Sequence, residues 1–395
     1  MMYTSANSWA GRWMPFAASV RFSMLVLAPL AIAFGAWQGG RERRRRVAEQ
    51  LASTPRPSWQ PLVVGWAGVT LGSWLGMLVV VAVGAAPVAA VATYSGGGWW
   101  WVLAVGFAGV AGVAAVGVAL GRAVPFRLMA PVAAIVIYSL QVYAHDSGLL
   151  FGAEWLVPIM QVSEAAGNTL SGRVSLQQAL WFGGLAAAVL VLVGARRRWL
   201  VVVPAAVATV GAAPLLGGPP YTSWQVDPTA AELVCTDDEP EVCLARVDAF
   251  LLDDVTPRAR EMLARFDGVP GGPARAVGST YGATGTREQA LYVDTGRVTI
   301  TGDLFVDEDS RVTSWWPELV CDSDAPHLRY HWMIEVAAIW ASDGPQRWTA
   351  PEVRDPLDAL LAMPEVDQKA WIGRVIEAAA SCDEDVLTKL AKQLE

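Results

Sequence analysis

The stretch LVVGWAGVTLGSWLGMLVVVAVGAAPVAAVATY, residues 62–94, runs for 33 residues without an Asp, Glu, Lys, Arg or His. An α-helix needs about 20 mostly apolar residues to cross the hydrocarbon core of a bilayer, so this stretch suffices for a span with its flanks. Similar runs lie on both sides of it. The sequence therefore predicts a mainly helical protein, built on a polytopic bundle of about six transmembrane helices.

The predicted spans cover residues 22–38, 62–85, 99–121, 124–144, 175–195 and 199–217. The first run is the shortest, and a cleaved signal peptide is an alternative interpretation of it. A signal peptide carries its basic residues before the apolar run, whereas here the basic cluster follows it. We therefore expect a span at this position.

Charge divides the chain into two parts. Residues 1–220 carry 14 Arg, no Lys and 5 acidic residues, a net charge of +9, and residues 221–395 carry 15 basic and 32 acidic residues, a net charge of −17. We expect a transmembrane domain over residues 1–217, a proline-containing linker over 218–227, and an acidic domain over 228–395. This division argues against a purely soluble enzyme, a disordered chain and a general nucleic-acid binder.

The arginines predict the orientation of the bundle. Loops 40–61, 121–127 and 195–199 hold 11 basic residues, whereas the opposite side holds Arg12, Arg21 and Arg173. Because short basic loops stay in the cytoplasm, we expect a multi-pass plasma-membrane protein with its acidic domain outside the cell. This orientation also places the N-terminus outside, and one explanation is a further span upstream of the first residue.

All four cysteines lie in the acidic domain: Cys235, Cys243, Cys321 and Cys382. An even set of cysteines in an extracytoplasmic segment favours disulfides. Of the three possible pairings, we prefer Cys235 with Cys243 and Cys321 with Cys382. A zinc site is the alternative, but it calls for closer CxxC-type spacing.

The segment RERRRRVAEQLASTPRP, residues 41–57, follows the first predicted span. Val47, Ala48 and Leu51 form one helical stripe, and Pro55 ends the pattern, so we expect a short cytoplasmic helix over residues 42–54, here called the elbow. The simplest interpretation is topological, namely a basic cluster that stops transfer, followed by an interfacial helix.

A span, a Glu with basic residues, and a short helix ending in Leu-x-x-Thr-Pro together resemble the permease subunits of type-two ABC exporters. The closer similarity is to actinobacterial integral membrane permeases that have a Thr-Pro-Arg-Pro elbow and an extracytoplasmic C-terminal domain with a cysteine pair around an acidic stretch, as at residues 235–243. The elbow positions that this resemblance assigns to contact with the ATPase are Glu42, Arg43, Glu49, Leu51, Thr54 and Pro55.

The resemblance implies a separate ABC ATPase as partner and a homodimer or heterodimer of permease subunits in the lipid membrane. The chain departs from the family at Arg45-Arg46, where a Gly-Thr pair is usual, and in lacking a span before the first. In the family, the region of residues 145–177 forms short outer helices that dip toward the bilayer. Glu154 and Glu164 in this region are candidates to line a path, although solvated loop acids are the simpler interpretation.

A phosphate-binding loop of the form GxxxxGK[ST] needs a Lys after a Gly. The three lysines, Lys369, Lys389 and Lys392, all lie in the acidic domain, and none follows a Gly. We therefore expect no nucleotide hydrolysis through such a loop, an ATPase on a separate polypeptide, and no cofactor.

The acidic domain is predicted to be mostly helical with a small sheet, an α+β domain. Helices are expected over residues 241–266 (broken near Pro257), 328–340, 352–362, 366–380 and 384–394, with a strand pair within 291–306. His327 and His331 lie four residues apart, a spacing that suits a metal, but the HExxH pattern is missing, so surface histidines are the better interpretation. The alternative function is a non-transporting membrane protein that presents this domain as a sensor or partner-binding module.

Overall fold

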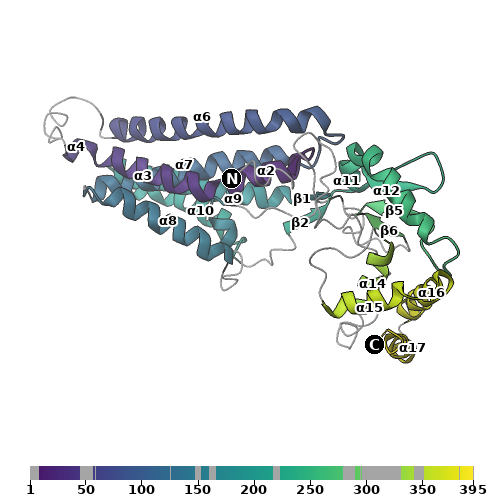
Figure 1. Cartoon of the computed structure of the whole chain (residues 1–395). Coiled ribbons are helices and arrows are strands. Elements are labelled where there is room, and N and C mark those ends of the chain that lie inside the picture. Colours follow the sequence, from purple (N-terminus) through teal and green to yellow (C-terminus); the bar gives the residue numbers. More distant parts are fainter. Residues whose placement is uncertain are drawn as a thin grey trace.

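The computed structural model describes residues 9–44, 57, 59–124, 126–146, 153–159, 166–216, 223–278, 290–293, 295, 331–341, 351–381 and 383–394. These residues form an elongated, mainly helical molecule (Figure 1). A bundle of long helices occupies one end, and a smaller part with a sheet and shorter helices occupies the other. This division follows the division of charge in the sequence.

The bundle contains α2 (Trp13–Phe22), α3 (Met24–Gly39), α6 (Trp59–Val91), α7 (Trp99–Ala123), α8 (Met129–Asp146), α9 (Gly172–Gly194) and α10 (Val202–Ala212). Among the described residues, α6, α7 and α9 are each long and apolar enough to cross a membrane, and α2 with α3 forms a fourth candidate bent by 42°. Helices α8 and α10 are apolar but shorter. These helices are consistent with the predicted membrane protein, and the number of six spans stays a prediction.

The bend between α2 and α3 lies at Ser23. The Ser23 hydroxyl donates a hydrogen bond of 2.5 Å to the carbonyl of Val20, one turn earlier. Such back-bonding by serine favours helix bending. The bend allows the first candidate span to begin at Trp13, well before the predicted start at residue 22.

Helices α3 and α7 pack closely through two Gly-x-x-x-Gly pairs. Gly35 and Gly39 lie on α3, and Gly117 and Gly121 lie on α7. A Cβ atom at Gly39 would collide with the carbonyl of Val118, and one at each of the other three would also meet backbone oxygen of the facing helix. Small residues allow this close approach, which drives helix association in lipid.

Helix α6 is held at one edge of the bundle by tryptophans. The indole N–H groups of Trp66 and Trp74 each donate a 2.9 Å hydrogen bond to a backbone carbonyl of α7, at Ala111 and Phe107. Only a narrow side of α6 is buried, and large apolar side chains such as Leu75 are exposed along its outer face. That distribution suits a helix in contact with lipid.

One end of the bundle carries a cluster of arginines together with exposed tryptophans. Trp37, Trp59 and Trp199 are exposed at the end where α3 and α9 finish and α6 begins. This end also carries Arg41, Arg122 and Arg196 to Arg198, and we call it the basic end. Exposed tryptophans recur at the start of α7 (Trp100 and Trp101), as expected for the two aromatic belts of a membrane protein.

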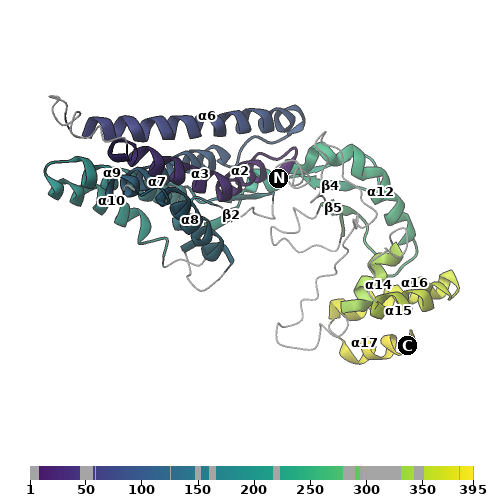
Figure 2. The ribbon, with the colours of Figure 1, turned by 60° about the vertical axis from the view of Figure 1, so that its left-hand side comes forward.

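The acidic domain lies at the end of the bundle opposite the basic end (Figures 1 and 2). Its sheet has the order β3-β4-β5-β6, in which β3 and β4 form an antiparallel hairpin and the other neighbours are parallel. The elements up to the sheet's last strand are α11 (Pro228–Ala231), β3 (Leu233–Cys235), β4 (Val242–Ala245), η5 (Arg246–Leu251), α12 (Leu252–Arg265), β5 (Ala276–Gly278) and β6 (Leu291–Val293).

The predicted helix over residues 241–266 was wrong in its first half. Val242–Ala245 is a fully buried strand between β3 and β5, and the helix α12 begins only at Leu252. The sheet needs this apolar run as a central strand, so tertiary packing overrides the helical periodicity. Pro257 lies inside α12, which continues to Arg265 without a break.

The last four predicted helices lie close to the observed ones, which are α14 (His331–Ala341), α15 (Pro351–Leu361), α16 (Glu365–Ser381) and α17 (Glu384–Ala391). Trp371 of α16 is buried in the core and donates to the carbonyl of Leu390. Asp383 caps α17 by accepting from the N–H of Val386 at 3.1 Å, as its position before the helix predicts. Of the predicted strand pair, β6 is described, and most of residues 294–306 lie outside the described part.

The predicted linker contains a strand. Within residues 218–227, β2 (Trp224–Val226) pairs antiparallel with β1 (Asn168–Leu170), which precedes α9. The described part of the predicted linker is therefore a paired strand next to the bundle.

Candidate functional site

The elbow begins at the basic end. After α3 ends at Gly39, the short helix α4 (Arg41–Arg44) carries Glu42 and Arg43 away from the bundle. The other predicted coupling residues, Glu49, Leu51, Thr54 and Pro55, lie outside the described residues. The structure thus describes the first turn of the predicted elbow.

An open cavity of about 310 Å³ lies beside α4, between the ends of α3 and α7 and the start of α6. Its polar lining comes from Gln38, Arg41, Glu42 and Arg122, and its apolar lining includes Leu62. The cavity is thus a polar opening at the end of three candidate spans, next to the predicted coupling segment.

The arginines around this cavity differ in their surroundings. Arg44 donates to the carbonyl of Trp37, and its guanidinium lies 4.7 Å from the centre of the Trp37 ring. Arg41 is exposed and Arg122 is half-buried, and neither has a carboxylate of another described residue within ion-pair distance. The cavity therefore offers two guanidinium groups to a ligand.

A second polar site lies inside the bundle, around Arg21 of α2, whose side chain is fully buried. Its Nε donates to the carbonyl of Pro158 at 3.2 Å, and its Nη1 donates to Oε1 of Gln178 at 3.0 Å. Gln178 of α9 in turn donates to the carbonyl of Trp155 at 2.9 Å. We call Arg21, Gln178 and residues 153–159 the buried arginine site.

Residues 153–159, which include the 3-10 turn η2 (Ala153–Leu156), are irregular backbone held between helices. Trp181 of α9 also donates to this segment, at the carbonyl of Leu156. Gly109 of α7 makes room for this segment, because a Cβ there would lie 3.2 Å from Pro158, and Gly106 makes room for the Arg21 side chain, which a Cβ there would meet at 3.3 Å. Irregular backbone is tolerated at membrane depth only where protein buries it, and ionisable residues there mark functional sites.

Sequence reasoning missed this site. It placed Arg21 among the basic residues of the outer side and Gln178 within an apolar span. The signal available was the Gln itself, a polar residue near the start of the apolar run 174–195. The predicted path residue Glu154 lies at the edge of the site, half-buried, and Glu164 lies outside the described residues.

A third set of polar contacts joins the bundle to the acidic domain. Nε of Arg12, just before α2, lies 2.6 Å from Oδ1 of Asp248, with exposed side-chain fractions of 2% and 0%. Asp248 also accepts from the Thr295 hydroxyl at 2.8 Å, and Arg12 donates to the Thr295 carbonyl. The neighbouring Ala10 belongs to the apolar core of the acidic domain. The N-terminal segment is therefore part of that domain's interior.

Tyr94, three residues beyond the end of α6, adds to this joint. Its hydroxyl donates to Oδ2 of Asp227 at 2.6 Å, while Oδ1 of Asp227 caps α11. Burial, together with the hydrogen bond and charge of Asp227, raises the pKa of Tyr94 to about 12. Thr93 donates to the carbonyl of Arg246 at 2.8 Å. The bundle and the acidic domain are thus joined at several points.

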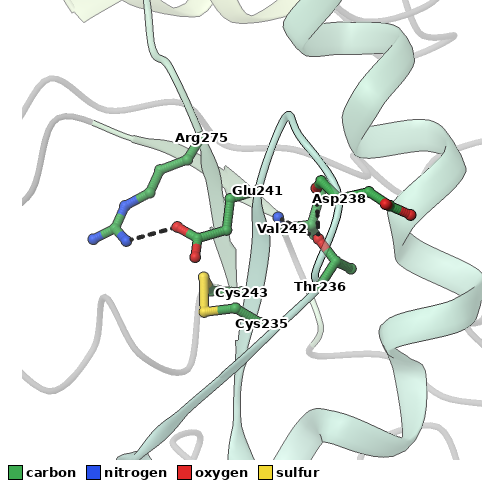
Figure 3. Close-up of a disulfide and its surroundings, with 7 residues drawn as sticks. All are labelled: Cys235, Thr236, Asp238, Glu241, Val242, Cys243 and Arg275. Carbon is green, nitrogen blue, oxygen red and sulfur yellow. Dashed lines mark hydrogen bonds and ion pairs between the residues drawn. A yellow bond between two sulfur atoms is a disulfide. The ribbon is translucent and has the colours of Figure 1, made fainter.

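The disulfide between Cys235 and Cys243 closes the β3–β4 hairpin, where the two residues are direct cross-strand partners (Figure 3). This predicted pairing is confirmed. Glu241 lies beside it and forms an ion pair of 3.1 Å with Arg275. Cys321 and Cys382 lie outside the described residues, so their pairing stays a prediction.

Among the described residues, one group of possible metal-ligating side chains lies close together. Cys235, Cys243 and Glu241 lie within ligand distance of one another, but both sulfurs are bonded in the disulfide and offer no thiolate. His327 lies outside the described residues, and His331 begins α14. The structure therefore leaves the prediction of surface histidines untested.

In comparisons with known proteins, no family model matches the chain, and no curated protein or solved structure matches it. The resemblance to exporter permeases therefore rests on the elbow and the cysteine pair alone.

Proposed function

We propose that the protein is the membrane-spanning permease subunit of an ABC-type export system, driven by a separate ATPase. The observation that carries this proposal is the position of α4. The helix continues from the first candidate span and borders an open cavity between α3, α6 and α7. A force on the elbow has space to shift the ends of three candidate spans relative to one another.

The packing of the bundle supports transmission of such a shift. The glycine pairs bind α3 tightly to α7, and α7 also packs on α9. The buried arginine site lies between α2 and α9. A displacement that starts at α4 therefore reaches a polar site inside the bundle, where a transported molecule with polar groups would find hydrogen-bonding partners.

This proposal includes the orientation and the partners that the sequence predicts. The basic end faces the cytoplasm and meets the ATPase, and the acidic domain lies outside the plasma membrane. Two permease subunits, identical or different, complete the pathway. The chain itself catalyses no nucleotide hydrolysis.

Co-purification of the detergent-solubilised full chain with an ABC ATPase from its native host tests the proposal. The variant Glu42→Arg with Glu49→Arg reverses both acidic charges of the elbow and should abolish capture of the ATPase. The matched control is Arg197→Glu, a charge reversal at an exposed residue of the same end. If wild type captures no ATPase, or if the elbow variant captures as much as the control, the proposal fails.

A second candidate is a membrane-anchored sensor that presents the acidic domain to a partner. The observation favouring it is the insertion of Ala10 and Arg12 into that domain, which connects the domain directly to the first candidate span. Under this candidate, deleting residues 228–395 abolishes signalling, and no ATPase accompanies the purified chain.

A further inference from the structure

We infer that the cavity at the basic end binds the headgroup of an anionic phospholipid. The inference goes beyond the proposed function, because it concerns the chain alone in its bilayer. It starts from the position of the cavity at the ends of three candidate spans. Arg41 follows the end of α3, and Arg122 lies in the last turn of α7. Both guanidinium groups therefore lie at the level where lipid headgroups lie.

The lining has the chemistry of a phosphodiester site. Arg41 and Arg122 each present several N–H donors, and arginine suits phosphate because its donors match two phosphate oxygens. The amide of Gln38 adds a neutral donor. With Glu42 included, the charged lining sums to +1, which balances the single negative charge of a phosphodiester. The carboxylate of Glu42 is an acceptor for hydroxyl groups, as on the glycerol headgroup of phosphatidylglycerol.

The apolar lining distinguishes a lipid from a free ion. Leu62 lies one turn inside α6, and Val118 lies one turn before Arg122, so the apolar wall lies on the bilayer side of the charged groups. A free phosphate has nothing to place against these side chains, whereas a lipid has its glycerol and the first carbons of its acyl chains. The volume of about 310 Å³ suits a headgroup, since ligand pockets begin at about 300 Å³.

Known basic pockets between transmembrane helices on the cytoplasmic side bind lipid headgroups in this way. Arg44 does not line this cavity, because its guanidinium is held on Trp37. The site therefore depends on Arg41 and Arg122, and an arginine elsewhere at the basic end should not replace them.

Native mass spectrometry of the delipidated full chain in detergent tests the inference, with phosphatidylglycerol, phosphatidylcholine and inorganic phosphate as separate titrants. We expect phosphatidylglycerol to bind at least about tenfold more tightly than phosphatidylcholine, and Arg122→Gln to lose about tenfold, the scale of one charged hydrogen bond. The matched control Arg197→Gln removes an exposed arginine of the same end that does not line the cavity, and it should bind like wild type.

A second pair of variants tests the cavity without changing charge. Gly65 lines the cavity, so Gly65→Leu should fill it and weaken phosphatidylglycerol binding, whereas Gly68→Leu, one turn along at a position facing open space, should not. Equal losses in Arg122→Gln and Arg197→Gln would show general attraction to the basic end and overturn the inference. Displacement of the lipid by equimolar inorganic phosphate would also overturn it, since the site would then take a soluble ion.

Discussion

The ion pair of Arg12 and Asp248 gives a quantitative test of how the bundle and the acidic domain are joined. Its two side chains are 2% and 0% exposed, and the Asp248 carboxylate also accepts from Thr295. Replacing Arg12 with Met keeps most of the length of the side chain but leaves a buried carboxylate without its cation. Removing one partner of a buried pair costs about 3–5 kcal/mol, because the remaining charge is uncompensated.

The assay is thermal unfolding of the acidic domain in the purified full chain, followed by near-ultraviolet circular dichroism. For a domain of this size, 1 kcal/mol lowers Tm by about 2–4 °C, so Arg12→Met should lower Tm by about 6–20 °C. The double variant Arg12→Met with Asp248→Leu removes both charges, and its Tm should be higher than that of either single variant. This non-additivity identifies the ion pair as the cause.

The matched control is the ion pair of Arg246 and Glu232, whose side chains are 40% and 57% exposed. Exposed pairs contribute about 0–1 kcal/mol, so Glu232→Gln should shift Tm by a few degrees at most. If Arg12→Met shifts Tm no more than Glu232→Gln does, or if the double variant is destabilised by the sum of the single variants, the buried pair does not join the two parts as described.

Three further predictions concern other parts of the molecule. Gly121→Val should separate α3 from α7 and abolish a folded, monodisperse protein in size-exclusion chromatography, whereas Gly72→Val, which faces open space on α6, should leave it unchanged. Tyr94 has a native pKa raised to about 12 from 10, so its contribution to stability is present below pH 10 and lost as pH rises from 10 to 12. Tyr94→Phe should remove the loss of stability between pH 10 and 12, measured as Tm in thermal scans. If the Tm of the variant falls with pH as that of wild type does, Tyr94 is not the group responsible. Reduction of Cys235–Cys243, which closes a short loop, should destabilise the acidic domain by about 2–4 kcal/mol in denaturant titrations, and an unchanged midpoint would refute a stabilising role.

The sequence predicted those features that depend on local composition. Long apolar runs require helices, so α6, α7 and α9 lie close to the predicted ranges. The Cys235–Cys243 pair was predicted because an even set of cysteines in an outer segment favours disulfides, and the resemblance to exporter permeases implies a pair around this acidic stretch. The last helices of the acidic domain were also predictable, since their apolar and charged residues alternate at helical spacing.

The features that the sequence did not predict depend on contacts between distant residues. Asn168 and Val226 show this for the β1–β2 ladder, because neither short segment has a strand pattern that is visible without its partner. The role of Arg21 depends on Gln178 and on the backbone of residues 155–158, which approach it only after the bundle has folded. The α3–α7 contact could not be predicted because the sequence contains many glycines. A glycine that faces open space and a glycine that faces another helix look alike in sequence.

The first candidate span and its ends carry arginines at three levels, and the three arginines lie in different surroundings. Arg12, inside the acidic domain, has a carboxylate, since a buried cation there needs an opposite charge. Arg21, inside the bundle, has a carbonyl and an amide, which hold a guanidinium by hydrogen bonds among helices. Arg41, at the basic end, lines the open cavity between α3, α6 and α7. Under the proposed function, a displacement at the elbow would move the contacts of Arg21 before it reached Asp248, because the bent helical pair of α2 and α3 connects these levels. Replacing Arg21 with Met should therefore uncouple the basic end from the acidic domain while leaving the Arg12–Asp248 pair intact. Hydrogen exchange of α12 on addition of the ATPase would measure this, and an exchange response that persists in Arg21→Met would place the coupling along another helix.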